Sequence, residues 1–325
     1  MPMNDSAASA NHYRKNKLRE RLRWPRPRGC YIQLPGLVTS AFLSQIHDSE
    51  TPDPTRPFDL PTKSVEVNGT ILRYLDVGAG EPIVFVHGSL GDYRTWGYQF
   101  EAFAEHFRVI SYSRRWHYPN TSPAPETTTY SSALHTEDLA AFVRQLDCGP
   151  VHLAGNSMGG IISLKAAHRY PDLVRSLILN EPGYFNWLPL LPGGENLLAQ
   201  ITQRYFVPAR ELMLRGKTQE GIRMFVEGVM PGQWSKLTPA MIAVILDNAD
   251  EFRAEIDASE WMSPFSFEDA ASTRTPALVM TGGDTEEIFR VLNAQFSRLH
   301  SQCRVGHRSG CLSRDLRLCA GCVQP

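Results

Sequence analysis

The sequence predicts an α/β fold with a mostly parallel, doubly wound sheet and a helical insert. Apolar, strand-like runs alternate with amphipathic helical segments up to residue 183, the alternation stops over 184–270, and strand character resumes at 276–280. Strands that alternate with helices favour right-handed crossovers and a parallel sheet covered on both faces. A helical insert between two strands of such a sheet is typical of a cap over a site at the strands' carboxyl ends.

Composition limits the class of protein. The 325 residues are 42% hydrophobic, and the longest apolar runs are too short for a membrane span, so we expect a folded body and no membrane-spanning helix. The net charge of -1 divides into +6 over residues 1–47, +4 over 298–325 and -11 between them. An acidic body argues against nucleic acid as a partner, because phosphate contacts need clustered basic residues on the folded surface.

Four of the six cysteines lie in the last 23 residues, and the acidic body holds only Cys148. The body therefore resembles a reduced, cytoplasmic protein without disulfide bonds. Residues 1–60 show no sustained period and carry a basic, Arg-rich segment over 14–28. This segment is interpreted as a disordered extension or linker, with a targeting peptide as the alternative.

The first part of the core is expected over 61–183. Asn68-Gly69 predicts a tight hairpin between two alternating segments, and Ile83–Val86 is a continuous apolar run typical of a strand buried on both faces. The remaining expected elements are strands at 109–110, 151–154 and 177–179 and helices at 133–146 and 159–170.

The helical cap is expected over 184–270, with helices at 197–204, 221–229 and 239–255, and the second part of the core over 271–299. The aromatic residues of the cap are expected either to line an apolar pocket or to form the core of the cap itself. They are Tyr184, Phe185, Trp187, Trp261, Phe265 and Phe267.

The segment Gly155-Asn-Ser157-Met-Gly159-Gly follows an apolar strand and opens a helix, as a nucleophile elbow requires. A serine in such a strained turn projects its hydroxyl above the sheet, so Ser157 is the candidate nucleophile. The segment His87-Gly88-Ser89 follows the strand at 83–86, where this architecture places one oxyanion donor. We assign the oxyanion hole to the backbone N–H groups of Ser89 and Met158, and we expect His87 and Gly88 to order the loop.

These two motifs, in this order and spacing, resemble the α/β-hydrolase superfamily, in its cap-bearing serine hydrolase branch, over residues 63–297. The segment Tyr112–Pro119 also resembles the fourth-strand loop of some members. The resemblance implies a Ser–acid–His triad in that chain order that acts by acyl transfer. We expect no cofactor. Serine at the elbow favours attack on a carbonyl, so the expected substrate is a small, largely apolar ester-like molecule. The alternative is an inactive chain that keeps the fold and only binds a small-molecule ligand.

The triad acid has two candidates. Asp284 follows the strand that usually carries this acid, but it stands one residue short of the usual spacing. Glu181 closes the strand at 177–179, 24 residues after Ser157, and relatives with the acid on that strand have similar spacing. A buried Glu181 that only binds backbone amides is the structural alternative.

Residues 300–325 are expected to form an irregular Cys/Arg-rich tail, with the last strand and helix of the fold missing. The base is then His307 or absent. Read one base further along, the codons of this segment permit a Pro-Gly-x-x-His sequence of the kind that the resemblance predicts, which suggests a frameshift near Leu299. The coding DNA tests this hypothesis. A zinc site of His307, Cys311, Cys319 and Cys322 is the rival interpretation of the tail, but one C-x-x-C pair is a weak signal, and we expect no metal.

Overall fold

The computed structural model describes residues 60–120, 130–258, 263–283 and 285–308. The chain divides into two units, 1–46 and 47–325, and every described residue belongs to the second. In this described part, no helix is long and apolar enough to cross a membrane. Several predictions from the sequence fall outside it: the basic extension up to residue 59, Trp261, Asp284 and the tail from residue 309.

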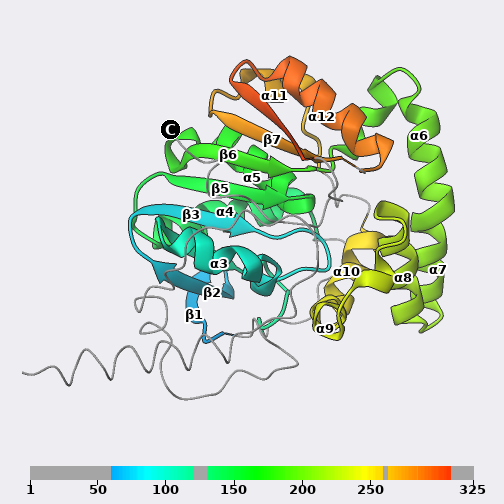
Figure 1. Cartoon of the computed structure of the whole chain (residues 1–325), viewed down its shortest axis with the longest axis horizontal. Helices are drawn as coiled ribbons and strands as arrows, with labels where there is room; N and C mark the ends of the chain where they lie inside the picture. The colour runs from blue at the N-terminus through cyan, green and yellow to red at the C-terminus, as the bar shows by residue number, and fades with distance from the viewer. Residues whose placement is uncertain (1–59, 121–129, 259–262, 284, 309–325) are drawn as a thin grey trace, which may run out of the picture. The chain divides into compact units, whose positions relative to one another are not determined.

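An eight-stranded sheet forms the centre of the second unit, in the order β1-β2-β4-β3-β5-β6-β7-β8 (Figure 1). β1 and β2 are antiparallel, β2 and β4 are antiparallel, and every later neighbouring pair is parallel. This confirms the mostly parallel sheet predicted from the sequence. The strands are β1 (Lys63–Val67), β2 (Thr70–Gly78), β3 (Glu81–Val86), β4 (Phe107–Tyr112), β5 (Val151–Asn156), β6 (Val174–Asn180), β7 (Ala277–Gly282) and β8 (Cys303–Arg308).

The first two strands form the predicted hairpin. Val67 pairs with Thr70 across the turn, and both turn residues have positive φ, 45° at Asn68 and 71° at Gly69. Such a turn matches the right-handed twist of the strands that it joins, which is why Asn-Gly is favoured in this position.

Helices cover both faces of the sheet. Val84 and Val86 face a large apolar cluster that includes residues of α4, α5, α11 and α12. Phe85, between them, faces the other side, where its ring stacks on Trp96 at 4.7 Å and meets Phe103 of α3 edge-on at 5.5 Å. Both faces of β3 are thus buried, as its continuous apolar run predicts. The helices are α3 (Gly97–Ala104), α4 (Ser132–Gln145), α5 (Met158–Arg169), α11 (Phe267–Ser272) and α12 (Glu287–Leu299).

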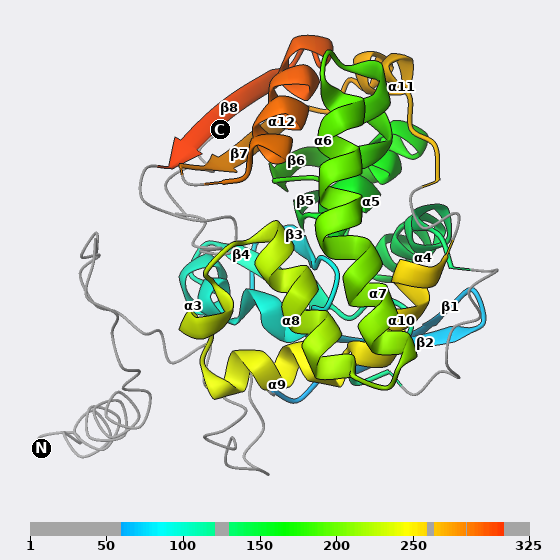
Figure 2. The same ribbon diagram turned by 90° about the vertical axis from the view of Figure 1, so that its right-hand side faces the viewer.

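A helical insert separates β6 from β7 in the sequence, and its helices α6 to α10 lie beyond the carboxyl ends of the parallel strands in both views (Figures 1 and 2). Its helices α7 to α10 share an apolar cluster with Leu90 of the β3–η1 loop. The insert consists of the 3₁₀ turn η3 (Phe185–Leu190), α6 (Gly194–Ile201), the π-helical turn η4 (Thr202–Phe206), α7 (Val207–Leu214), α8 (Thr218–Val229), η5 (Trp234–Lys236), α9 (Pro239–Asp247) and α10 (Ala249–Asp257).

The expectation of a missing last strand is wrong. Cys303–Arg308 forms β8, which pairs in parallel with β7 from Ala277 to Gly282. An edge strand needs no continuous apolar run, because only part of its surface is buried, and Val305 keeps 46% of its surface exposed. The expected loss of a final helix concerns residues outside the described part of the chain.

The helix before β8 was also missed in the sequence. In α12, Ile288, Leu292 and Phe296 recur every four residues and are at most 3% exposed. This spacing places all three on one face, which packs into the same cluster as α5. The helix therefore connects β7 to β8 by the crossover expected between parallel strands.

Candidate active site

Ser157 occupies a strained turn between β5 and α5. Its φ is 51° and its ψ is -118°, a backbone conformation that residues other than glycine rarely adopt. Its amide N–H donates to Asn180 O at 2.9 Å, and its own carbonyl accepts from Gly160 N at 2.9 Å. Its side chain makes no capping hydrogen bond to α5. The hydroxyl is thus left to face the pocket described below.

The flanking glycines are required by close backbone packing. A Cβ atom at Gly155 would stand 2.4 Å from the carbonyl oxygen of Gly159. A Cβ atom at Gly160 would stand 2.9 Å from Pro182 Cβ. These distances are shorter than van der Waals contact, so the elbow forms only because side chains are absent at these positions.

The loop after β3 lies against this elbow. A Cβ atom added at Gly88 would lie 3.0 Å from Asn156 O and 3.1 Å from Ser157 Cβ. The Gly88 carbonyl accepts hydrogen bonds from His87 Nδ1 at 2.9 Å and from Gly91 N at 3.3 Å. Because carbonyl and N–H groups of one trans peptide point in opposite directions, the Ser89 N–H points away from these donors.

His87 is fully buried, and both of its ring nitrogens are occupied. Nε2 accepts from the Arg114 amide at 2.9 Å, so the proton lies on Nδ1, which donates to Gly88 O. Burial, together with His117 and Arg114, lowers the pKa of His87 well below its ordinary value, so the ring is neutral at neutral pH. These contacts are those of a residue that orders the loop, the role expected from the sequence.

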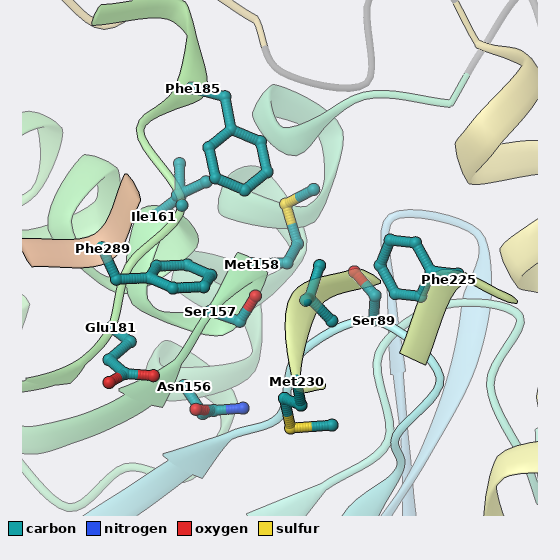
Figure 3. Close-up of a pocket in the computed structure, with 12 residues that line it drawn as sticks. Ser89, Asn156, Ser157, Met158, Ile161, Glu181, Phe185, Phe225, Met230 and Phe289 are labelled. Carbon is teal, nitrogen blue, oxygen red and sulfur yellow. The ribbon is translucent and has the colours of Figure 1, made fainter. Parts of the chain in front are cut away.

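A small cavity opens beside Ser157, and Figure 3 shows the Ser157 hydroxyl directed into it between Phe289, Phe185 and Ser89. Its volume is about 50 Å³, room for a few water molecules only. Both residues assigned to the oxyanion hole, Ser89 and Met158, line it. The full lining is Ser89, Asn156, Ser157, Met158, Ile161, Glu181, Gly183, Phe185, Phe225, Val229, Met230 and Phe289.

A second, larger cavity of about 360 Å³ lies within the insert. We call the small cavity beside Ser157 the reaction cavity and the larger one the chamber. Phe185 and Phe225 line both, so these two rings stand between them. Phe185 lines both cavities and also packs in the apolar core, which contains Tyr184, Trp187 and Phe265 as well. Phe267 packs against this core and lines neither cavity. The chamber is lined by Phe185, Asn186, Leu198, Thr202, Phe206, Val207, Arg210, Phe225, Phe252, Glu255 and Ile256.

Glu181 reaches the reaction cavity from the end of β6. It has positive φ (44°) and is 1% exposed, and its Oε1 accepts a hydrogen bond from Gly282 N at 2.8 Å. Burial raises the pKa of this carboxyl, while the Gly282 amide and the Thr285 hydroxyl oppose that rise. Asp284, the other candidate acid, lies outside the described residues.

The candidate base is a histidine near the end of the chain. His307 lies in β8, where its backbone pairs with Thr281 of β7, and its side chain is outside the described part of the structure. His300 is 2% exposed at the end of α12 and accepts from Gln302 N at 3.3 Å. The described residues that line the reaction cavity include no histidine. Two residues of the site were not predicted from the sequence. Asn156 lines the reaction cavity, and Glu255, which no motif marks, lines the chamber.

Comparison with known proteins supports a family assignment. The family model described as alpha/beta hydrolase family matches residues 83–319. The chain is 35% identical over 119 residues to the dihydrolipoyllysine-residue acetyltransferase component of the acetoin cleaving system of Pseudomonas putida, covering 36% of the chain and 31% of that protein. It is 32% identical over 114 residues to (E)-2-((N-methylformamido)methylene)succinate hydrolase of Acinetobacter baylyi, covering 35% and 42%. The chain thus spans less than half the length of these two curated relatives.

Among solved structures, carboxylesterase CesB of Bacillus subtilis superposes with a TM-score of 0.61. The two chains are 17% identical, and the match covers 80% of this chain and 87% of that one. Identity at this level shows a shared fold alone. The family match extends over most of the chain and includes both the elbow and the loop beside it, so the chain belongs to the alpha/beta hydrolase family.

Proposed function

We propose that this protein is a serine hydrolase that acts by acyl transfer on a small, largely apolar ester-like carbonyl substrate. The observation that carries the proposal is the juxtaposition of Ser157 and the Gly88–Ser89 peptide. The serine sits at positive φ with its hydroxyl in a cavity, and an added Cβ atom at Gly88 would lie 3.1 Å from its Cβ. A nucleophile and backbone donors around one small space are what acyl transfer requires.

In this reaction the Ser157 oxygen attacks the substrate carbonyl carbon and gives up its proton to a base. The backbone N–H groups of Ser89 and Met158 bind the negative oxygen of the tetrahedral intermediate. The Ser89 N–H points away from the Gly88 carbonyl, and the Met158 N–H lies at the start of α5. The protonated base then gives its proton to the leaving oxygen as the intermediate expels the alcohol. Water, which transfers a proton to the same base, hydrolyses the acyl-enzyme and restores the Ser157 hydroxyl. The base is His307, the histidine nearest the expected place in the chain, oriented by Glu181 or Asp284.

The lining of the cavities supports an apolar substrate. Phe185, Phe225 and Phe289 surround the reaction cavity, and the aromatic residues of the chamber continue this surface. A reaction cavity of about 50 Å³ suits the reacting group, and the chamber of about 360 Å³ suits an apolar substituent.

An inactive chain that only binds a small ligand in these cavities is the second candidate. It is favoured by the absence of a histidine among the described residues that line the reaction cavity. Such a chain would keep the oxyanion donors and the apolar walls, but its serine would have no base.

A fluorophosphonate probe separates the two candidates, because it labels serines that are activated as nucleophiles. We expect the full-length protein to be labelled, Ser157→Ala to lose the label, and Ser235→Ala, a change at an exposed serine of the insert, to keep it. Absence of label in the wild-type protein, or label that persists in Ser157→Ala, would contradict the proposed hydrolase.

A further inference from the structure

A series of buried polar contacts starts and ends on the loop that carries the proposed oxyanion donor. The Ser89 hydroxyl donates to the carboxylate of Glu255, whose Oε2 lies 3.0 Å from the hydroxyl of Tyr130. The Tyr130 hydroxyl also donates a hydrogen bond to Oε1 of Glu251. His117 Nε2 lies 2.7 Å from this Glu251 oxygen. His117 Nδ1 then donates to the carbonyl of Gly91 at 2.7 Å. We call Ser89, His117, Tyr130, Glu251 and Glu255 the carboxyl cluster.

The carboxyl and phenol groups of the cluster are almost fully buried, so the hydrogens between them can be counted. Glu251 and Glu255 are 1% and 2% exposed, and Tyr130 is 1% exposed. Three contacts, Ser89–Glu255, Glu255–Tyr130 and Tyr130–Glu251, each need a hydrogen between their oxygens, but the two hydroxyl groups supply only two. The 2.7 Å contact between His117 Nε2 and Glu251 Oε1 needs a further hydrogen, because the proton of the neutral His117 ring lies on Nδ1. At least one of the two carboxyl groups must therefore carry a proton.

Charge also favours a protonated carboxyl group. The buried guanidinium of Arg114 interacts electrostatically with both carboxyl groups, and arginine stays protonated in proteins. One ionised carboxyl group balances this charge, while two would leave an uncompensated negative charge in a buried site. The other titratable groups that face the pair are His117 and Tyr130, and His87 and His135 lie next to His117.

Arg114 connects the carboxyl groups to the oxyanion peptide from a second side. Its Nη2 donates to the Gly88 carbonyl at 3.2 Å. The Gly88–Ser89 peptide is thus held at its carbonyl by Arg114 and at the Ser89 side chain by Glu255. Because the peptide is planar, fixing its carbonyl and the Ser89 side chain also fixes the direction of the Ser89 N–H.

We propose that Glu255, together with Glu251, positions the oxyanion-binding N–H of Ser89 through buried hydrogen bonds in which at least one of the two carboxyl groups is protonated. The inference rests on the proposed serine hydrolase function and adds to it positioning residues from the insert. Neighbouring contacts attach the same part of the insert to the segment after the loop: Asn248 Nδ2 donates to Asp92 Oδ2 at 2.8 Å, and Arg94 Nη2 pairs with Asp247 at 3.0 Å. The end of α9 and helix α10 thereby support the oxyanion loop.

Hydrogen exchange measured by mass spectrometry tests the positioning without relying on activity. In a Ser157→Ala background, we expect Glu255→Leu to speed exchange of amides in 87–91 about tenfold, the factor expected for one lost charge-assisted hydrogen bond. Glu255→Gln has a neutral side chain of nearly the same shape, whose oxygen can still accept a hydrogen bond from Ser89. We therefore expect its exchange rate in 87–91 to stay within about twofold of the rate in the Ser157→Ala parent. Glu195→Gln, on the exposed surface of α6, is the matched control. Exchange in Glu255→Leu equal to that in the control would overturn the proposal.

Saturation kinetics with the fluorophosphonate probe give the second test. We expect Glu255→Leu to lower the maximal labelling rate about tenfold or more while probe affinity stays within about twofold, because the oxyanion forms only after binding. Ser89→Ala, which removes only the hydroxyl, should lower the rate equally, and the double variant no further, since both changes break one contact. Additive losses, or a loss in affinity alone, would refute the positioning role. If Ser157 of the wild-type protein does not react at all, the proposed function fails, and the exchange experiment still decides this inference.

Discussion

Gly159 lies so close to Val86 that a Cβ atom on Gly159 would stand 2.1 Å from the Val86 carbonyl oxygen. This contact joins the start of α5 to the end of β3, and it brings the loop after β3 beside Ser157. The site therefore depends on a backbone approach that no side chain other than hydrogen allows.

We expect Gly159→Ala to lower the free energy of unfolding by about 1–3 kcal/mol, because the new methyl group forces α5 away from β3. Urea unfolding followed by circular dichroism measures this. Gly306→Ala is the control, since an added Cβ there meets nothing nearer than 3.6 Å. Equal stability of the two variants would show that the packing around Gly159 is looser than described.

The candidate triad acids are separated by neutral replacements. We expect Glu181→Gln to slow acylation of Ser157 by about 10²–10⁴-fold, because the carboxylate holds and stabilises the protonated base during proton transfer. Asp284→Asn should change the rate much less, since Glu181 already reaches the reaction cavity. The opposite order of the two variants would assign the acid to Asp284.

The carboxyl cluster predicts a pH dependence of stability. Burial raises the pKa of Glu251 from the usual 4.5 to about 7. Burial and repulsion from Glu251 raise the pKa of Glu255 from 4.5 to about 7 as well. The folded state then binds more protons than the unfolded state between these values, so the contribution of the pair to stability is present below about pH 4.5 and is lost as pH rises through 7. We expect Glu255→Gln to flatten this part of the profile, measured by urea unfolding between pH 4.5 and 8. An unchanged slope, equal to that of Glu195→Gln, would count against a protonated carboxyl group in the cluster.

Removal of the ring between the two cavities should change substrate preference. Phe225→Ala joins the reaction cavity to the chamber, so we expect the ratio of kcat/KM for an octanoyl ester over an acetyl ester to rise about tenfold, as burial of one or two more methylene groups would give. Phe267→Ala is the control, because this ring packs on Trp187 and lines neither cavity. A ratio unchanged in Phe225→Ala would show that the chamber does not hold the acyl chain.

The sequence predicted those parts of the site that depend on local backbone geometry. Asn68-Gly69 marked the hairpin and Gly155-x-Ser157-x-Gly159 marked the turn after β5, because glycine and strained turns leave a pattern in neighbouring positions. β8 was missed because an edge strand carries little apolar signal. Glu255 and Arg114 were missed because their partners lie far along the chain, and nothing near either residue indicates burial.

Burst kinetics with p-nitrophenyl butyrate, with mass spectrometry of the quenched protein, test the central claim most directly. We predict a burst of nitrophenolate and one butyryl group on the peptide that contains Ser157, both absent in Ser157→Ala. No adduct on that peptide, or hydrolysis that is equally fast in Ser157→Ala, would contradict the account.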